Sequence, residues 1–198
     1  MILAFLLLGC PSKHVYPDGG GLEAQLEREV IALQATVRRL EAQEPGGGGP
    51  DPIYAELHQV LAACECTVES RGSTTLITLR DGDLFAADEW TVRDEARMSL
   101  DMLATAVKMR PGYTVTIEGH TGDLMPASMS AKFSNLYDLS YVRAGQVMSI
   151  LVDDFHVETE RFALVAKGPN QPVASNDTAA GQNQNRRVVI LIQPPAKR

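Results

Sequence analysis

The residues best suited to chemistry lie in one stretch of the chain, from Val115 to Arg143. It contains a polar segment with two glycines, Gly119-His120-Thr121-Gly122, and it ends on an arginine in the first turn of an expected helix. A guanidinium presents two parallel N–H donors to a carboxylate, and the backbone N–H groups at a helix N-terminus also favour an anion. Arg143 is therefore suited to binding a carboxylate.

Catalysis and metal binding are not expected. His120 has no second positioned acid–base partner in the sequence, so we expect it to order the loop rather than to transfer protons. Cys64 and Cys66 lack further ligands at metal-binding spacing, because the four histidines are scattered. We therefore expect no enzyme activity, no metal and no other cofactor. Whether Cys64 and Cys66 are buried thiols or a tight disulfide stays open.

Two elements must position the polar stretch. Val115-Thr116-Ile117 is a β-branched run typical of a buried strand, and the glycines that follow end it. Asp138-Leu139-Ser140 then opens an amphipathic helix whose apolar residues recur at helical spacing. The strand end, the polar loop and the charged helix start are thus expected to converge at one place.

The rest of the folded domain, residues 53–198, is predicted from the same kinds of pattern. In chain order we expect a helix at 53–63, a strand at 74–79, a helix at 92–109, a strand at 113–118, a helix at 135–153 and strands at 161–166 and 187–192. This βαβαββ order predicts an α+β fold with a mixed sheet and helices on one face, a two-layer α/β sandwich.

Composition limits the classes of partner. The 198 residues are 44% hydrophobic and 22% charged, which is typical of a globular protein. A net charge of -7 argues against general nucleic-acid binding, which relies on Lys and Arg to neutralise phosphates. An acidic protein of this kind needs a local basic site to hold an anion.

The N-terminal segment points to a membrane anchor. Residues 1–10, MILAFLLLGC, are an apolar run that resembles a bacterial lipobox, in which the cysteine, here Cys10, receives a lipid and the preceding residues are removed. The alternative is an ordinary signal peptide with a chance cysteine. The run is too short to span a bilayer. Because Pro11 rather than Asp follows, we expect the outer membrane rather than the inner.

The segment between anchor and domain reads as tether, helix and linker. Residues 11–21 contain Pro, Gly and Ser without periodicity, and residues 45–52 form a Gly/Pro linker. Between them, residues 22–44 carry apolar side chains at alternating steps of four and three, which is a heptad seam. This helix could be a spacer, a coiled coil that makes a homodimer, or a helix packed on the domain.

Four ordered motifs carry a family resemblance. IEGHT, then N-x-x-x-LS-x-x-RA at residues 135–144, then GPNQPVASN, then NRRV at residues 185–188 resemble the signature of the OmpA-like C-terminal domain over about residues 75–193. The phrase KFSNLYDLSYVRA is most similar to the flagellar stator MotB branch. The resemblance implies non-covalent binding to peptidoglycan, through the diaminopimelate of its stem peptide.

The resemblance also implies the site. Diaminopimelate carries an ammonium and a carboxylate on one carbon, so the family uses an acid after GHT and the arginine of LS-x-x-RA, here Arg143. The acid position departs from the family, because Gly122 stands there and the nearest acid is one residue later. The ligand-binding residues implied by the motifs, with that acid included, are Thr121, Asp123, Asn135, Leu139, Arg143 and Arg187.

Two functions follow as expectations. The first is an outer-membrane lipoprotein that faces the periplasm and binds peptidoglycan, tethering the envelope to the cell wall. The second is an OmpA-like module that has lost wall binding, because of Gly122, and contacts another envelope protein. A stator function would need a transmembrane helix with an ion-carrying acid, which this sequence does not show.

Overall fold

The computed structural model describes residue 32 and residues 49–62, 64–86 and 89–196. The chain divides into two units, Met1–Glu41 and Ala42–Arg198, and all the elements below belong to the second. The predicted lipobox at 1–10 with Cys10, the tether at 11–21, the helix at 22–44 apart from Ala32, and the linker up to residue 48 lie outside the described residues. These expectations stay predictions.

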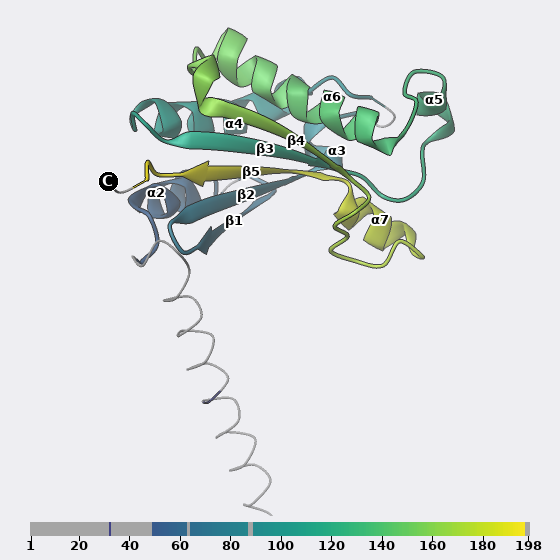
Figure 1. The fold of residues 1–198 in the computed structure, drawn as a ribbon, viewed down its shortest axis with the longest axis horizontal. Helices are drawn as coiled ribbons and strands as arrows, with labels where there is room; N and C mark the ends of the chain where they lie inside the picture. Colours follow the sequence, from purple (N-terminus) through teal and green to yellow (C-terminus); the bar gives the residue numbers. More distant parts are fainter. Residues whose placement is uncertain (1–31, 33–48, 63, 87–88, 197–198) are drawn as a thin grey trace, which may run out of the picture. The chain divides into compact units, whose positions relative to one another are not determined.

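A five-stranded mixed sheet forms the centre of the domain (Figure 1). Its strands are β1 (Cys66–Arg71), β2 (Thr74–Arg80), β3 (Thr114–His120), β4 (Phe162–Gly168) and β5 (Arg187–Gln193). They lie in the order β1-β2-β5-β3-β4, and all neighbours are antiparallel except the parallel pair β3 and β4. The predicted α+β class with a mixed sheet is confirmed.

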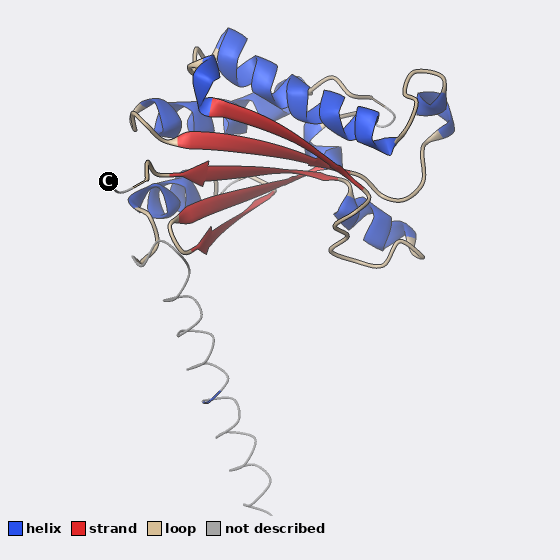
Figure 2. Cartoon of the chain, viewed as in Figure 1, coloured by secondary structure: helices blue, strands red, loops and turns tan. Residues whose placement is uncertain are grey.

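Helices pack on one side of this sheet and short helices lie in its connections (Figure 2). They are α2 (Pro52–Val60), α3 (Asp81–Leu84), α4 (Asp94–Lys108), α5 (Ala127–Ser130), α6 (Leu136–Ser149) and α7 (Ala179–Asn185), with a π-helical turn at Ile150–Asp154 and a 3-10 turn at Thr159–Arg161. Helix α6 contacts β3 and β4, while α2 contacts α4 and β1. The result is the expected two-layer sandwich.

Alternation along the strands decides which face is covered. Ile77, Ile117 and Ile190 are fully buried in the core under the helices. Their sequence neighbours point to the opposite face, where Leu76 and Val189 help to line a shallow cavity of about 530 Å³. Burial of the β-branched core residues, each worth about 2 kcal/mol, therefore fixes the register of the sheet.

Strand β1 was missed by the sequence analysis. Its sequence, CTVESR, has only two adjacent β-branched residues, and its side chains alternate between half-buried and exposed. It forms because it pairs antiparallel with β2 through a tight turn in which Gly72 adopts a φ of 59°. Strand β1 is therefore defined by its pairing with β2 rather than by a local sequence pattern.

One close approach sets the position of α6. A Cβ atom added to Gly119 of β3 would lie only 2.0 Å from the backbone oxygen of Ser140 in α6. Ser140 is fully buried, and its hydroxyl accepts a hydrogen bond from the backbone N–H of Gly168, 3.3 Å away. Because no side chain intervenes, the first turns of α6 lie directly on β3, which fixes where Arg143 emerges.

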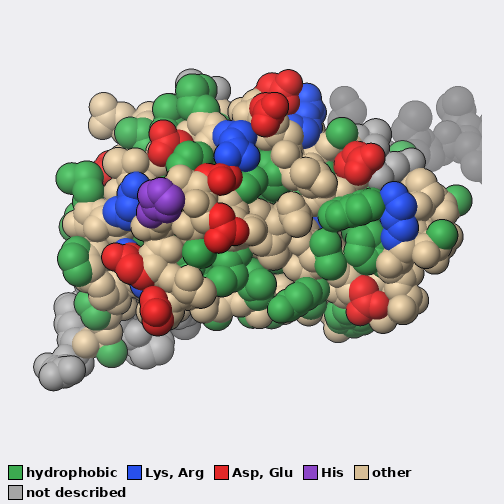
Figure 3. All heavy atoms as spheres, turned by 90° about the horizontal axis from the view of Figure 1, so that it is seen from above, with side chains coloured by type: hydrophobic (Ala, Val, Ile, Leu, Met, Phe, Trp, Pro, Cys, Tyr) green, Lys and Arg blue, Asp and Glu red, His purple; other side chains and the backbone are tan. Residues whose placement is uncertain are grey.

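Charges on the surface are mixed. Seen from above, the molecule shows acidic and basic side chains interspersed among hydrophobic ones rather than gathered into one basic stripe (Figure 3). Within the described part of the chain, no helix has both the length and the apolar character needed to cross a bilayer.

Candidate ligand-binding site

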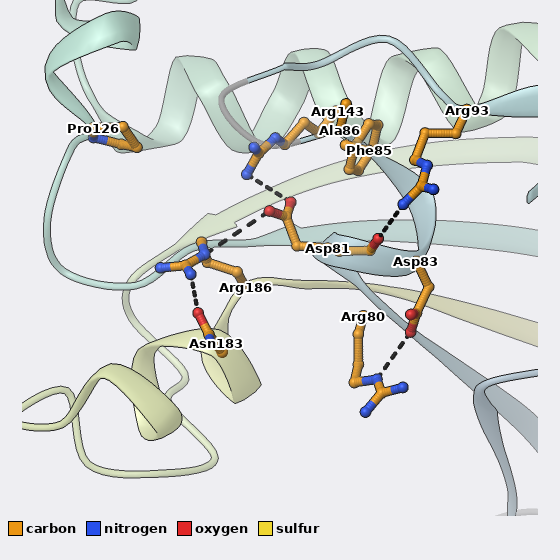
Figure 4. Close-up of a pocket in the computed structure, with 11 residues that line it drawn as sticks. Arg80, Asp81, Asp83, Phe85, Ala86, Arg93, Pro126, Arg143, Asn183 and Arg186 are labelled. Carbon is orange, nitrogen blue, oxygen red and sulfur yellow. Dashed lines mark hydrogen bonds and ion pairs between the residues drawn. The ribbon is translucent and has the colours of Figure 1, made fainter.

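A pocket of about 640 Å³ opens where β2 ends, between α3, α6 and α7 (Figure 4). Its walls carry four arginines and two aspartates, with smaller contributions from apolar and amide residues. The lining residues are Arg80, Asp81, Gly82, Asp83, Phe85, Ala86, Arg93, Pro126, Arg143, Asn183 and Arg186. The excess of guanidinium groups makes this a local basic site in an acidic protein.

Arg143 is held rigidly at the inner wall. Its side chain is only 4% exposed, and Nη1 lies 2.7 Å from the Oδ1 atom of Asp81. Nη2 donates a hydrogen bond of 3.0 Å to the backbone oxygen of Glu89, and the guanidinium lies 5.2 Å from the centre of the Phe85 ring. The arginine of the helix start is therefore paired with an acid that the motifs did not indicate.

Asp81 lies between two guanidinium groups. Besides Arg143, Arg186 approaches its Oδ2 atom with Nε at 3.8 Å (Figure 4). The backbone N–H of Asp81 donates to the backbone oxygen of Arg186, 3.0 Å away, which ties the end of β2 to the start of β5. Burial raises the pKa of the Asp81 carboxyl above its ordinary value, and the two arginines oppose that rise.

Of the six predicted ligand-binding residues, Arg143 is the one that lines this pocket. Asp123 is exposed and is not part of the wall. The Oδ1 atom of Asn135 caps α6, accepting hydrogen bonds from the backbone N–H groups of Tyr137 and Asp138. As ligand contacts, Asp123 and Asn135 stay predictions.

The other three predicted residues are buried elsewhere. Leu139 is 1% exposed and belongs to the apolar interior, while the backbone N–H of Thr121 donates to the backbone oxygen of Gly168. Arg187 lines the cavity on the opposite face of the sheet, where Nη1 donates to the Asn185 backbone oxygen and Nη2 to that of Gln171. The structure thus places these three residues outside the wall of the Arg143 pocket, and their contact with ligand stays untested.

Comparison with known proteins identifies the group to which this chain belongs. Residues 84–186, more than half of the chain, match the OmpA family. The chain is a member of the OmpA family.

Named relatives agree with this. Motility protein B of Bacillus subtilis is 34% identical over 119 residues, which cover 60% of this chain and 45% of that protein. The peptidoglycan-associated lipoprotein of Brucella melitensis is 29% identical, over 61% of this chain and 69% of that protein. The solved structure of the cell wall anchor of the T6SS from Pseudomonas aeruginosa superposes with a TM-score of 0.63 at 29% identity, over 71% of this chain and 99% of that one. The chain spans less than half of the first of these relatives.

The sequence analysis did not single out Asp81 or Arg186, the two charged residues that lie beside Arg143 in the pocket. Asp81 precedes the matched segment and Arg186 is its last residue. Strand alternation could have separated Arg186 from Arg187: Val188, Ile190 and Ile192 face the core, so Arg187 must face the other way. No local signal distinguishes Asp81 from Asp83, the other acid of α3.

His120 of the family motif is a buried, neutral side chain. It is 3% exposed, and neither ring nitrogen has a hydrogen-bond partner among the described residues. Its Nε2 atom lies 3.5 Å from Oε2 of Glu118. Burial, followed by the nearby Arg187 cation, lowers the pKa of His120 to about 4, despite the opposing effect of Glu118.

This burial predicts an acid-sensitive fold. Because the pKa of His120 is depressed in the folded state, its contribution to stability is complete above about pH 6.5, the unfolded value, and is lost as the pH falls towards 4. We expect this one group to account for about 3 kcal/mol of the free energy of unfolding across that interval. Urea unfolding of the wild type and His120→Gln at several pH values measures it. Parallel stability curves for the two proteins would contradict the prediction.

Proposed function

We propose that this protein binds peptidoglycan non-covalently through the pocket at Arg143. The observation that carries the proposal is a nearly buried guanidinium paired with a carboxylate at 2.7 Å, in a pocket rich in arginine, on an OmpA-family fold. Such a pocket favours ligands that carry carboxylates. The relatives named for peptidoglycan association and for anchoring to the cell wall support the same ligand.

The head group that fits is the diaminopimelate of the stem peptide. Its ammonium and carboxylate sit on one carbon, so the group is neutral overall but needs one acid and one guanidinium within a few ångströms of each other. Arg143 supplies the guanidinium from α6, and Arg186 offers a second, more accessible one at the pocket rim, with 31% of its side chain exposed.

We further propose that the domain serves as an envelope tether. In this proposal Cys10 carries a lipid in the outer membrane, the domain faces the periplasm, and residues 22–44 act as a spacer or as a homodimer contact. The lipobox pattern supports the anchor, and a relative named as a probable lipoprotein, from Escherichia coli, matches 75% of this chain at 28% identity. The function is binding rather than catalysis.

Sedimentation of the purified full chain with diaminopimelate-type sacculi tests the wall ligand. We expect the wild type to sediment with the sacculi and Arg143→Ala to lose affinity about 30-fold or more, because a desolvated ion pair then lacks one partner. Thermal unfolding of both proteins controls for folding. Arg71→Ala, an exposed arginine on β1, is the matched control and should bind like the wild type. Equal binding by Arg143→Ala would contradict the proposal.

A second function is favoured by one observation. Gly122 replaces the motif acid, and Asp123 next to it does not line the pocket. A side chain at position 122 would fit, because its Cβ would lie 3.5 Å from Gln182 and 3.7 Å from Asn176. If the wild type stays in solution while Gly122→Asp sediments, the domain has lost the wall ligand and serves as a protein-interaction module of the envelope.

A further inference from the structure

We propose that Asp81 is the carboxylate that holds the ligand's ammonium, taking the place of the acid missing after Thr121. The inference rests on the proposed function, and it names the ammonium-binding acid that the motif position after Thr121 lacks. Arg143 and Arg186 keep the carboxylate-binding half, so one pocket presents both charges that a zwitterionic amino-acid head group requires.

Asp81 is the carboxylate that points into the pocket. Among the described residues, the carboxylates in the pocket wall are those of Asp81 and Asp83. Asp83 is engaged on the outer side by Arg80, whose Nε lies 2.9 Å from Oδ2 (Figure 4). Asp81 instead points between Arg143 and Arg186, into the group of guanidiniums that would receive the carboxylate.

Asp81 is also held in place before a ligand binds. The backbone N–H of Asp81 is bonded to Arg186, and its carboxylate is 17% exposed, so it is held in the wall but still reachable. By contrast, Asp123 is an exposed loop residue outside the wall. A ligand therefore meets Asp81 in a fixed place without the loop having to shift by one residue.

The pairing of Asp81 with Arg143 and Arg186 also suits a zwitterionic ligand. Asp81 is the shared counter-charge of Arg143 and Arg186, so the buried Arg143 guanidinium already has a carboxylate beside it in the structure. A ligand with an ammonium and a carboxylate on one carbon can exchange partners with this pair, the ammonium taking Asp81 and the carboxylate taking a guanidinium. A ligand whose amine is blocked would place a carboxylate beside Asp81 without compensation, and it should bind poorly.

The test compares native sacculi with sacculi whose free amines have been acetylated, using the purified full chain. The wild type should bind native sacculi at least about 30-fold more tightly than acetylated ones. Asp81→Asn keeps the side-chain shape, and it should lose affinity for native sacculi by a similar factor and bind both kinds equally. Asp101→Asn, at an exposed acid of α4 outside the pocket wall, is the matched control and should bind like the wild type. Asp83→Asn and Asp123→Asn test the two competing carboxylates, and each should keep the preference for native sacculi.

Each outcome has a meaning. Asp81→Asn that still prefers native sacculi overturns the inference, even if its affinity has fallen, because a purely structural role would not remove the preference. Loss of the preference for native sacculi in Asp123→Asn or Asp83→Asn also overturns the inference. This comparison remains valid if Asp81→Asn does not fold. Wild type that binds native and acetylated sacculi equally refutes the ammonium contact alone. Wild type that binds neither refutes the proposed function and the inference with it.

Discussion

Gly119→Ala is expected to destabilise the domain by about 3 kcal/mol or more, because the new methyl group would collide with the backbone of α6. Its Cβ would lie 2.0 Å from the oxygen and 2.7 Å from the carbonyl carbon of Ser140. A backbone cannot rotate away as a side-chain tip can, so α6 must move off β3. Arg143 sits one turn further along the same helix, and its pairing with Asp81 should weaken as well.

Denaturant unfolding measures the loss of stability, and sedimentation with sacculi measures the loss of binding. Gly145→Ala is the matched control in α6, since its Cβ would meet only the Leu164 Cδ1 atom, at 4.0 Å. That variant should be unchanged or up to about 1 kcal/mol more stable, because alanine favours a helix interior over glycine. Equal stability of Gly119→Ala and the wild type would mean that the close packing of α6 on β3 is wrong.

Asn185→Leu is expected to cost about 3 kcal/mol and to release the loop before α7. The side chain of Asn185 is fully buried and makes four hydrogen bonds. Its Oδ1 accepts from the backbone N–H groups of Val173 and Ala174, at 2.7 and 3.0 Å. Its Nδ2 donates to the Ala174 backbone oxygen at 2.8 Å and to Oδ1 of Asn176 at 2.7 Å. Leucine would remove all four hydrogen bonds, at about 1–3 kcal/mol for each partner group that water cannot reach.

Two measurements check this prediction. Denaturant unfolding gives the stability, and amide hydrogen exchange at Val173 and Ala174 should accelerate strongly in the variant. Asn183→Leu, on the exposed side of α7, is the matched control and should change the stability by no more than about 0.5 kcal/mol. Unchanged protection at Val173 and Ala174 in Asn185→Leu would contradict the role of the side chain as the clamp of this loop.

Residues of the family motifs also have structural roles. The motifs implied Arg187 as a ligand-binding residue; in the structure Asn185 of the same NRRV motif holds a loop, and Arg187 lines the cavity on the opposite face of the sheet. Asn135 likewise caps α6, and Gly119, which has no side chain, allows α6 to pack directly on β3. Several motif positions thus have a structural task that precedes any contact with ligand.

Much of the fold could be predicted because the necessary information is local. The apolar spacing of α4 and α6 and the β-branched runs of β2, β3 and β5 define elements within a few residues of their expected bounds. Strand β1 could not be found this way, because it exists through pairing with β2 rather than through its own pattern. Sheet order was also beyond the sequence, since β5 inserts between β2 and β3 by long-range pairing.

By itself, the sequence determined the kind of protein: an OmpA-family fold, an arginine at a helix start, and a glycine where the family has an acid. Only the tertiary structure decided which groups meet that arginine. Asp81 and Arg186 are far apart along the chain, and they meet because β2 and β5 pair up to Arg80 and Arg187, the residues next to them. Side-chain direction at a strand end depends on register, and register is set by burial of the whole sheet, so no local motif could have named this pair.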